Sequence, residues 1–275
     1  MQPVVKWVGG KTRLLPELVK RAPKKFNRLV EPFAGGAALY FHLAPERALL
    51  ADSNGDLIAT YAAIASDPEA VIRRLMDHRR VHAAAPDAHY YRTRARWNAG
   101  NRSAWSRARH AATFIYLNKT CFNGLWRVNR DGEFNVPIGR YSNPSICMPK
   151  VIRAASKALS SAKLLCSDYR KAIASVCSYD FIYLDPPYDP LSATSSFTGY
   201  SANAFGRDQQ KELAETAREL VARDAYVMLS NSDTPFIRSL YRGFKISRVK
   251  CGRSISSKIT KRAAVNELII TGGPS

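Results

Sequence analysis

The stretch YLDPPYDP, residues 183–190, ends a run typical of a buried strand and then forces the chain to turn. The preceding residues, YDFIYLD, are rich in aromatic and β-branched side chains, which favour strands. The two prolines cannot donate hydrogen bonds to a sheet and their rings fix φ, so the strand has to end there. The sequence therefore predicts a rigid turn after a buried strand, with an acid, Asp185, before it and an aromatic residue, Tyr188, after it.

Short apolar runs of the same kind recur along the chain, and segments with helical spacing separate several of them. Residues 209–223 predict an amphipathic helix, capped by Asp208, whose apolar stripe is Leu213, Ala217, Leu220 and Val221. Such alternation predicts an α/β fold, an open and mostly parallel sheet with helices on both faces, which binds ligands at the carboxyl ends of its strands. The other predicted strands are RLVEPF (28–33), RALLAD (47–52), AKLLCSD (162–168), AYVMLSN (225–231) and NELIITG (266–272).

The middle of the chain has a different pattern. Residues 68–84 and 102–120 have helical spacing, and residues 121–141 predict a β-hairpin because Asp131-Gly132 is a favoured turn pair. We therefore predict a sheet domain, residues 1–60 and 166–275, interrupted by a helical and hairpin insertion, residues 61–165.

The charge of the chain is strongly positive, with 42 Lys and Arg against 22 Asp and Glu and a net charge of +20. The predicted insertion holds 18 basic and 6 acidic residues, and the rest of the chain holds 24 and 16. Such an excess favours a polyanionic partner, because binding phosphates releases counterions; a merely solvated basic surface is the alternative. The insertion is the expected contact.

Several classes of protein are disfavoured by the sequence. The five cysteines are odd in number and lack C-x-x-C spacing, which argues against a disulfide framework and a zinc site, so we expect no metal. The first residues lack a signal-peptide pattern and no apolar run reaches the roughly 18 residues of a membrane span. We expect a cytoplasmic protein that binds no membrane.

Two segments near predicted strand ends favour a nucleoside-containing cofactor. Gly35 and Gly36 follow a predicted strand and open a helix, where backbone amides can approach a ligand, although an ordinary tight turn would look the same. Asp52 ends the next strand, where an acid commonly binds ribose hydroxyls.

The N-terminal segment VKWVGGKT, residues 5–12, ends like a phosphate-binding loop but has Val5 where that motif needs glycine. A loop that lays Trp7 and Lys11 over a cofactor fits better, with Lys11 as a cation for a carboxylate. A buried tryptophan beside a solvated lysine is the alternative.

The turn after the strand fits a planar amino-heterocycle such as adenine. The Asp185 carboxylate and the Pro186 carbonyl would accept hydrogen bonds from the exocyclic amine, and Tyr188 would stack on the ring, which is worth roughly 1 to 3 kcal/mol per base. Fixed acceptors can align the nitrogen lone pair with an electrophilic methyl group without a covalent intermediate. A plain strand-ending turn remains possible.

These motifs together resemble the DNA adenine methylase (Dam) family of N6-adenine methyltransferases that use S-adenosylmethionine. The matching elements, in the family's order, are KWVGGKTRLL, EPFAGGAALYFHL, ADSNGDLI, NKTCFNGLWRVNRDGEFNVPIGRY and YLDPPYDP, and FTGYSANAF with SNSDT extends the likeness to about residue 234. The resemblance implies a Rossmann-like methyltransferase sheet with an inserted DNA-recognition domain made of helices and a β-hairpin.

The resemblance also implies roles for individual residues. The implied catalytic pocket is Asp185, Pro186, Pro187 and Tyr188. The implied cofactor contacts are Trp7, Lys11, Phe33, Gly35, Gly36, Asp52 and Asp185. The implied DNA contacts are Phe122, which would insert beside a flipped base, Arg127, which would read a guanine, and Asn123, Leu125, Asn129, Pro137 and Tyr141.

The implied reaction is methylation of adenine within GATC in double-stranded DNA, by a monomer or a weak dimer on DNA in a prokaryotic or phage-type setting. Neither Trp126 nor the arginines of residues 92–109 are assigned to bases by the resemblance, and phosphate contacts would suit those arginines. An N4-cytosine methyltransferase, a methyltransferase acting on RNA or on a protein glutamine, and a DNA-binding protein without activity are the alternatives. Asp185 argues against the first two.

Overall fold

The computed structural model describes residues 1–190, 205–251 and 265–274, and the chain divides into two compact units. The first unit comprises Met1–Gly10, Gly35–Ala44 and Asp52–Cys166, and the second comprises Lys11–Ala34, Pro45–Ala51 and Ser167–Ser275. Within the described ranges, no helix has the length and apolar character needed to cross a membrane.

The second unit is built on a mostly parallel sheet, which confirms the predicted Rossmann-like α/β fold. Its strands run in the order β2-β1-β4-β5-β7-β6. Strands β2, β1, β4 and β5 are parallel to one another, and β7 runs antiparallel to both β5 and β6. The bounds are β1 Leu29–Glu31, β2 Ala48–Asp52, β4 Phe181–Leu184, β5 Tyr226–Ser232, β6 Lys245–Cys251 and β7 Val265–Gly272. Five of these six strands were predicted and are confirmed, and β6 was not predicted.

The order of the strands reverses between β1 and β4. From β1 the chain continues to β2 on one side, and from β4 it continues to β5 on the other, while β1 and β4 themselves pair in parallel. A reversal of this kind leaves a crevice at the carboxyl ends of the two central strands, where ligands of such sheets bind. The turns that hold Phe33 and Asp185 follow these two strands.

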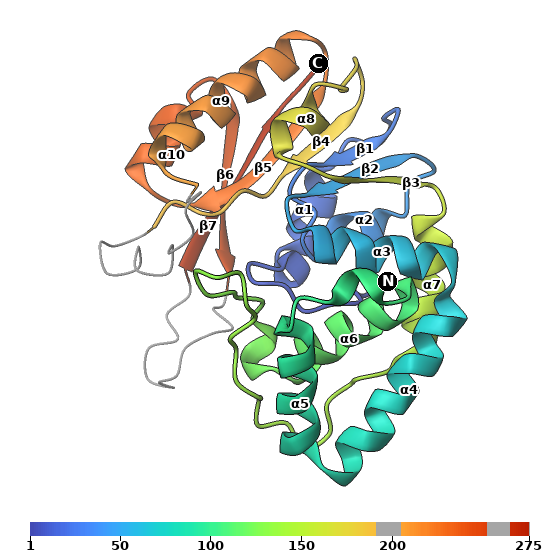
Figure 1. Ribbon diagram of the computed structural model, residues 1–275. Helices are drawn as coiled ribbons and strands as arrows, with labels where there is room; N and C mark the ends of the chain where they lie inside the picture. The colour runs from blue at the N-terminus through green and yellow to red at the C-terminus, as the bar shows by residue number, and fades with distance from the viewer. Residues whose placement is uncertain (191–204, 252–264, 275) are drawn as a thin grey trace. The chain divides into compact units, whose positions relative to one another are not determined.

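Helices of the second unit are η1 Lys11–Arg13, α1 Leu15–Arg21, α8 Tyr169–Ile173, α9 Arg207–Ala222 and α10 Pro235–Leu240 (Figure 1). Helix α9 packs against β5 with Leu213, Ala217 and Leu220 buried, as the apolar stripe predicts. The predicted cap is wrong: Gly206 is the N-cap, and Gln209 Oε1 accepts from its backbone N–H at 2.9 Å. Asp208 lies in the first turn of the helix and pairs with Lys211 at 2.9 Å.

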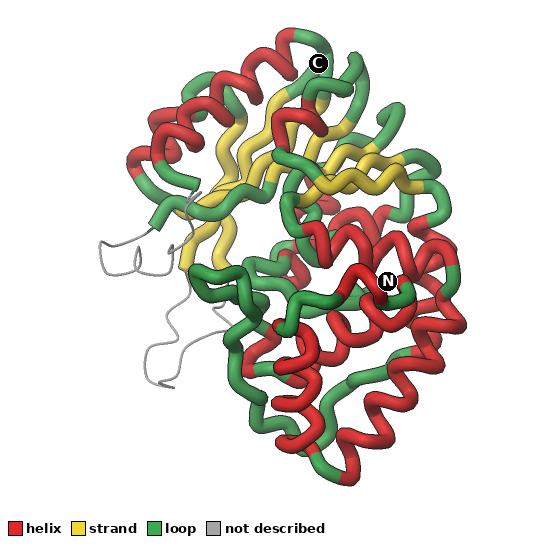
Figure 2. Tube along the Cα trace, in the orientation of Figure 1, coloured by secondary structure: helices red, strands yellow, loops and turns green. Residues whose placement is uncertain are grey.

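Figure 2 shows that the first unit consists almost wholly of helices and loops. The predicted helix over residues 68–84 is confirmed, whereas the one over 102–120 begins later, at Arg107, because Ser106 caps it. Helix α5 was not predicted. The elements are α2 Ala38–Leu43, α3 Gly55–Ser66, α4 Pro68–Ala84, α5 Pro86–Asn98, η2 Arg102–Ala104, α6 Arg107–Thr120, η3 Phe122–Gly124, α7 Pro149–Leu159 and the predicted strand β3 Ala162–Cys166.

The predicted hairpin is present as a loop with two isolated antiparallel bridges rather than as paired strands. Val128 bridges Phe134 around the Asp131-Gly132 turn, and Cys121 bridges Ile138. The side chain of Asn129 accepts from the backbone N–H groups of Asp131 and Glu133 and so fixes the turn. Regular pairing stops because Pro137 has no N–H to donate.

Candidate active site

Asp185 lies directly after β4 and is held by two donors on one oxygen. In the second unit, Lys11 Nζ lies 2.7 Å from Asp185 Oδ1, and Ser230 Oγ donates to the same oxygen at 2.8 Å. Since the Ser230 proton is used in this way, the Tyr183 hydroxyl, 2.9 Å away, donates to Ser230 in turn. Among the described residues, none donates to Asp185 Oδ2 or to the Pro186 carbonyl. Two acceptors therefore remain at the start of the turn.

The environment of the turn shifts two pKa values. Burial raises the pKa of Asp185 above that of an ordinary aspartate, and the charge of Lys11 with the hydrogen bonds from Lys11 and Ser230 opposes that rise. Burial also raises the pKa of Tyr188 well above its ordinary value, so this phenol stays neutral. Its hydroxyl donates to Glu267 Oε2 at 2.9 Å, and Lys11 Nζ lies 4.6 Å from the centre of its ring.

A network of amide side chains holds the rest of the turn. Gln210 Nε2 on α9 donates to the Pro187 carbonyl at 2.8 Å, and Asn231 Nδ2 on β5 donates to Gln210 Oε1 at 3.1 Å. Asn231 Oδ1 accepts from the backbone N–H of Asp189 at 3.0 Å. The roles of Gln210 and Ser230 were not predicted from the sequence, although Ser230 and Asn231 begin the SNSDT motif. The structure thus locks the turn from both flanking elements.

Phe33, after β1, contributes an aromatic surface to the second unit. Its ring stacks on Tyr169 with centroids 5.1 Å apart and meets Phe205 edge-on at 5.7 Å. Residues 197–204 of the FTGYSANAF motif lie outside the described residues. Phe33 is half-buried, which leaves part of its ring exposed at the ligand-binding end of the sheet.

Trp7 and Gly35 pack tightly in the first unit. Gly35 has φ of +46°, and a Cβ placed there would lie 2.6 Å from Trp7 Cδ1, so both the backbone conformation and the indole require glycine. A Cβ placed on Gly36 would lie 3.4 Å from Trp7 Cβ, which is an ordinary contact distance. The indole is half-buried and neighbours Phe114, with ring centroids 6.4 Å apart. Packing of Trp7 therefore requires glycine at position 35, whereas position 36 has room for a Cβ.

Asp52 is the acceptor that organises the glycine turn of the first unit. Its Oδ2 accepts from the Gly35 N–H and its Oδ1 from the Asn54 N–H, each at 2.9 Å. Burial raises its pKa, and these two backbone hydrogen bonds oppose the rise. Each carboxylate oxygen has a second lone pair, so the group can still accept from a diol. In the described part of the chain, no cluster of three His, Cys, Asp or Glu side chains is placed to bind a metal.

The predicted DNA-contact residues lie together on the loop of residues 121–141. Phe122 is 47% exposed in η3, and Asn123 and Gly124 after it have positive φ. Arg127 is exposed, with its Nε donating to Asn135 at 2.9 Å. Asn129 is used by the turn, because its amide also donates to Glu133 at 3.0 Å. Leu125 is half-buried and Pro137 is exposed.

The base of this loop is anchored by aromatic and basic residues. Trp126, unassigned from the sequence, packs on Phe114 and Phe134 with ring centroids 4.0 and 4.5 Å away, so it attaches the loop to α6. Lys6 Nζ lies 4.3 Å from the centre of the Tyr141 ring. Lys119 at the end of α6 is 7% exposed, and burial, with the nearby Lys6, lowers its pKa to about 8.

Two of the arginines between residues 92 and 109 have a carboxylate or carbonyl acceptor in the described chain. Arg102 pairs with Asp56 at 2.9 Å and lies over Trp97, and Arg94 donates to the Val136 carbonyl at 3.2 Å. His110 Nε2 shares Asp56, at 2.9 Å. These contacts explain the positions of Arg94 and Arg102 without any contact to DNA.

Comparison with known proteins shows which proteins this chain resembles. The family model described as D12 class N6 adenine-specific DNA methyltransferase matches residues 7–255. The chain is 38% identical over 273 residues to the type II methyltransferase M1.LlaDCHI of Lactococcus lactis subsp. cremoris, covering 98% of this chain and 95% of the relative. It is 38% identical over 273 residues to the DNA adenine methylase of Haemophilus influenzae (99% and 94%), and 37% identical over 269 residues to that of Escherichia coli K12 (96% and 93%).

Proposed function

Because the chain belongs to the D12 class of N6 adenine-specific DNA methyltransferases, we propose that it methylates N6 of an adenine flipped out of duplex DNA, within the sequence GATC. It is an S-adenosylmethionine-dependent DNA adenine methyltransferase, and its substrate is DNA. The observation that carries the proposal is the turn after β4, where Asp185 Oδ2 and the Pro186 carbonyl are acceptors with no donor among the described residues.

The turn would act by positioning the target amine. Asp185 Oδ2 and the Pro186 carbonyl accept its two N–H groups, which directs the nitrogen lone pair away from the ring plane. S-adenosylmethionine, when bound, supplies an electrophilic methyl group. One proton leaves the amine on methylation, and we assign Asp185 Oδ2 as its acceptor because burial raises the pKa of this carboxyl. Tyr188 would stack on the extruded base and so offset part of the cost of unstacking it.

The residues proposed to bind the cofactor fit it by the chemistry of their side chains. Asp52 keeps acceptor lone pairs for ribose hydroxyls, and Phe33 offers an aromatic face after β1. Lys11 already pairs with Asp185, so its first task would be to orient that carboxylate. The proposed set is Trp7, Lys11, Phe33, Gly35, Gly36, Asp52 and Asp185.

The loop of residues 121–141 is proposed to read the DNA sequence. The Nη1 and Nη2 atoms of Arg127 have no acceptor among the described residues, and a bidentate contact to guanine needs two such donors. Exposed Phe122 would enter the duplex beside the flipped adenine. The proposed set is Phe122, Asn123, Leu125, Arg127, Asn129, Pro137 and Tyr141, with Asn129 acting through the turn that it fixes.

The proposal also covers where the protein acts and how many copies of it bind DNA together. A duplex DNA substrate favours action in the cytoplasm, on the nucleoid. We expect a monomer or a weak dimer on DNA, and sedimentation with and without a short GATC duplex distinguishes the two.

The test is transfer of label from S-adenosylmethionine to matched duplexes with and without GATC, followed by base-resolved mapping. We expect N6-methyladenine in the first duplex and almost none in the second. Label at another adenine would overturn the GATC assignment alone. Label at cytosine, or binding without transfer, would overturn the proposed chemistry.

A further inference from the structure

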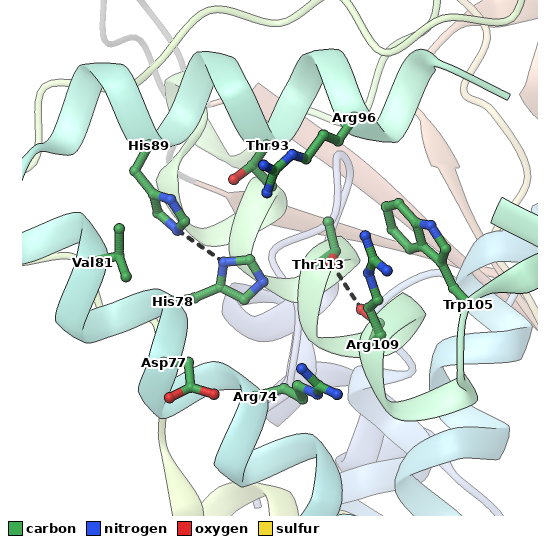
Figure 3. A pocket seen from close by; sticks show the side chains of 10 residues that line it. All are labelled: Arg74, Asp77, His78, Val81, His89, Thr93, Arg96, Trp105, Arg109 and Thr113. Carbon is green, nitrogen blue, oxygen red and sulfur yellow. Dashed lines mark hydrogen bonds between the residues drawn. The ribbon is translucent and has the colours of Figure 1, made fainter. Parts of the chain in front are cut away.

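A pocket of about 260 Å³ lies among three helices of the first unit, and none of its lining residues belongs to the sites proposed above. Figure 3 shows His78 and Arg74 entering from α4, His89 and Arg96 from α5, and Arg109 from α6. Thr93, Thr113, Val81, Asp77 and Trp105 complete the lining. The pocket thus joins parts of the chain that lie far apart in sequence.

Three arginines, one from each helix, line this pocket. Within residues 1–190, 205–251 and 265–274, none of Arg74, Arg96 and Arg109 forms an ion pair with a carboxylate. Arg109 instead lies over Trp105, 4.3 Å from the ring centre. The single acid in the lining, Asp77, faces Arg80 at 3.9 Å. Like charges gathered in this way repel one another, and an anion between them would remove that repulsion.

Two histidines, His78 and His89, also line the pocket. His78 Nδ1 lies 3.0 Å from His89 Nε2, and the His78 ring stacks on Tyr116 with centroids 4.5 Å apart. Burial lowers the pKa of His78 to about 3, helped by His89, Arg74 and Arg109, and burial lowers the pKa of His89 as well. At neutral pH the positive charge of the pocket therefore comes from the arginines.

We propose that this pocket binds a phosphate group. Planar guanidinium groups match phosphate oxygens in pairs, and the Thr93 side chain in the same lining carries one more hydroxyl donor. The phosphate belongs either to the DNA backbone or to a small molecule such as inorganic phosphate or a mononucleotide. The site goes beyond methyl transfer, because it requires neither GATC nor the cofactor.

The test compares two double variants that lose the same charge from the same helices. Arg74→Gln with Arg109→Gln removes two pocket arginines, whereas Arg73→Gln with Arg107→Gln removes exposed arginines outside the lining. Thermal unfolding of both proteins checks that each is folded. Each is then titrated with inorganic phosphate by calorimetry, and with a short duplex lacking GATC at several salt concentrations.

Two results would support the site and identify the source of the phosphate. For a backbone phosphate, the slope of log K against log salt becomes shallower by about 0.9 in the pocket variant, and the control variant changes less. For a small ligand, phosphate binds the wild type and the control but not the pocket variant, and the two variants share one DNA slope. Equal behaviour of the two variants in both titrations overturns the proposal.

Discussion

Ser230 and Asp185 face each other across neighbouring parallel strands, and the serine hydroxyl donates to Asp185 Oδ1 at 2.8 Å. Lys11 binds the same oxygen, so one side of the carboxylate is fixed by the protein. The other oxygen then has a defined direction. This pairing makes the acid at the end of β4 a positioned acceptor rather than a freely rotating one.

Asp185→Ala is expected to abolish methyl transfer while leaving DNA binding without cofactor near the wild-type level, because the acceptor is lost but the basic loop is untouched. Single-turnover transfer and a mobility-shift assay measure the two properties. Asp208→Ala, an exposed acid on α9, serves as the control and should retain activity. Substantial transfer by the Asp185 variant would contradict the assigned role.

Ser230→Ala is expected to move the acid limb of the kcat/KM profile to higher pH. Burial raises the pKa of Asp185 and the Ser230 hydrogen bond opposes that rise, so removing the donor raises the pKa further. Asp185 then becomes protonated, and loses its acceptor function, at a higher pH than in the wild type. Ser232→Ala on the same strand is the control. An unshifted limb would show that Asp185 ionisation does not govern the rate.

Gln210→Ala is expected to lower kcat by roughly 10- to 100-fold with little change in KM, because the Pro187 carbonyl and Asn231 both lose their partner. Gln209→Ala is a matched control on the same turn of α9, since its amide binds only the N-cap backbone at Gly206 in the described chain. Steady-state measurement of kcat and KM for the two variants distinguishes a local effect at the turn from a general effect on the helix. Equal losses in both would indicate a general weakening of the helix.

Arg127→Ala is expected to relax recognition at one base pair, at a cost of roughly 1 to 3 kcal/mol in discrimination. Competition between GATC duplexes and duplexes with single substitutions measures this preference. Arg130→Ala removes the same charge from the same loop and should weaken binding to all sequences alike. If the Arg127 variant kept its preference, recognition would have to lie elsewhere.

Lys119→Met is expected to change how stability depends on pH. Burial lowers the pKa of Lys119 from 10.5 to about 8, so between these values the unfolded chain holds a proton that the folded chain has lost. The free energy of unfolding therefore rises with pH across this window, by up to about 3 kcal/mol from this group, and this gain is lost as pH falls through 8.

Urea unfolding of wild type and Lys119→Met at pH values below and above the window tests that expectation. The methionine variant lacks the rise, so its advantage over the wild type should shrink as pH increases. Lys150→Met, at an exposed lysine, should run parallel to the wild type. Parallel curves for Lys119→Met would show that the fold does not lower the pKa of this lysine, which would then stay charged across the window.

The strands of the sheet were predictable because their apolar runs are short and bounded by turn residues. Strand β6, KISRVKC, was not predicted because its alternating charges suit an edge strand and resemble a solvated loop. Helix α5 was not predicted because its arginines and aromatic residues are spread around the helix. Its burial depends on partners in α4 and α6.

The geometry of the candidate site was predictable where one short motif sets it, as in the turn at Asp185. It was not predictable where side chains act from distant positions. Gln210 lies on a helix whose pattern reports only burial, and nothing local marks it as the partner of Pro187. The pairing of Lys11 with Asp185 likewise depends on the folded chain, so Lys11 was assigned to a carboxylate of the ligand rather than of the protein.

Strand β7 lies between β5 and β6 in the sheet, and this position affects when the turn after β4 is completed during synthesis. This strand follows β6 in the sequence, yet it inserts between β5 and β6, and it brings Glu267, which accepts a hydrogen bond from the Tyr188 hydroxyl. A nascent chain that has emerged only as far as β6 lacks the hydrogen-bond partner of the Tyr188 hydroxyl. The surroundings of Tyr188 are therefore complete only after β7 has been synthesised.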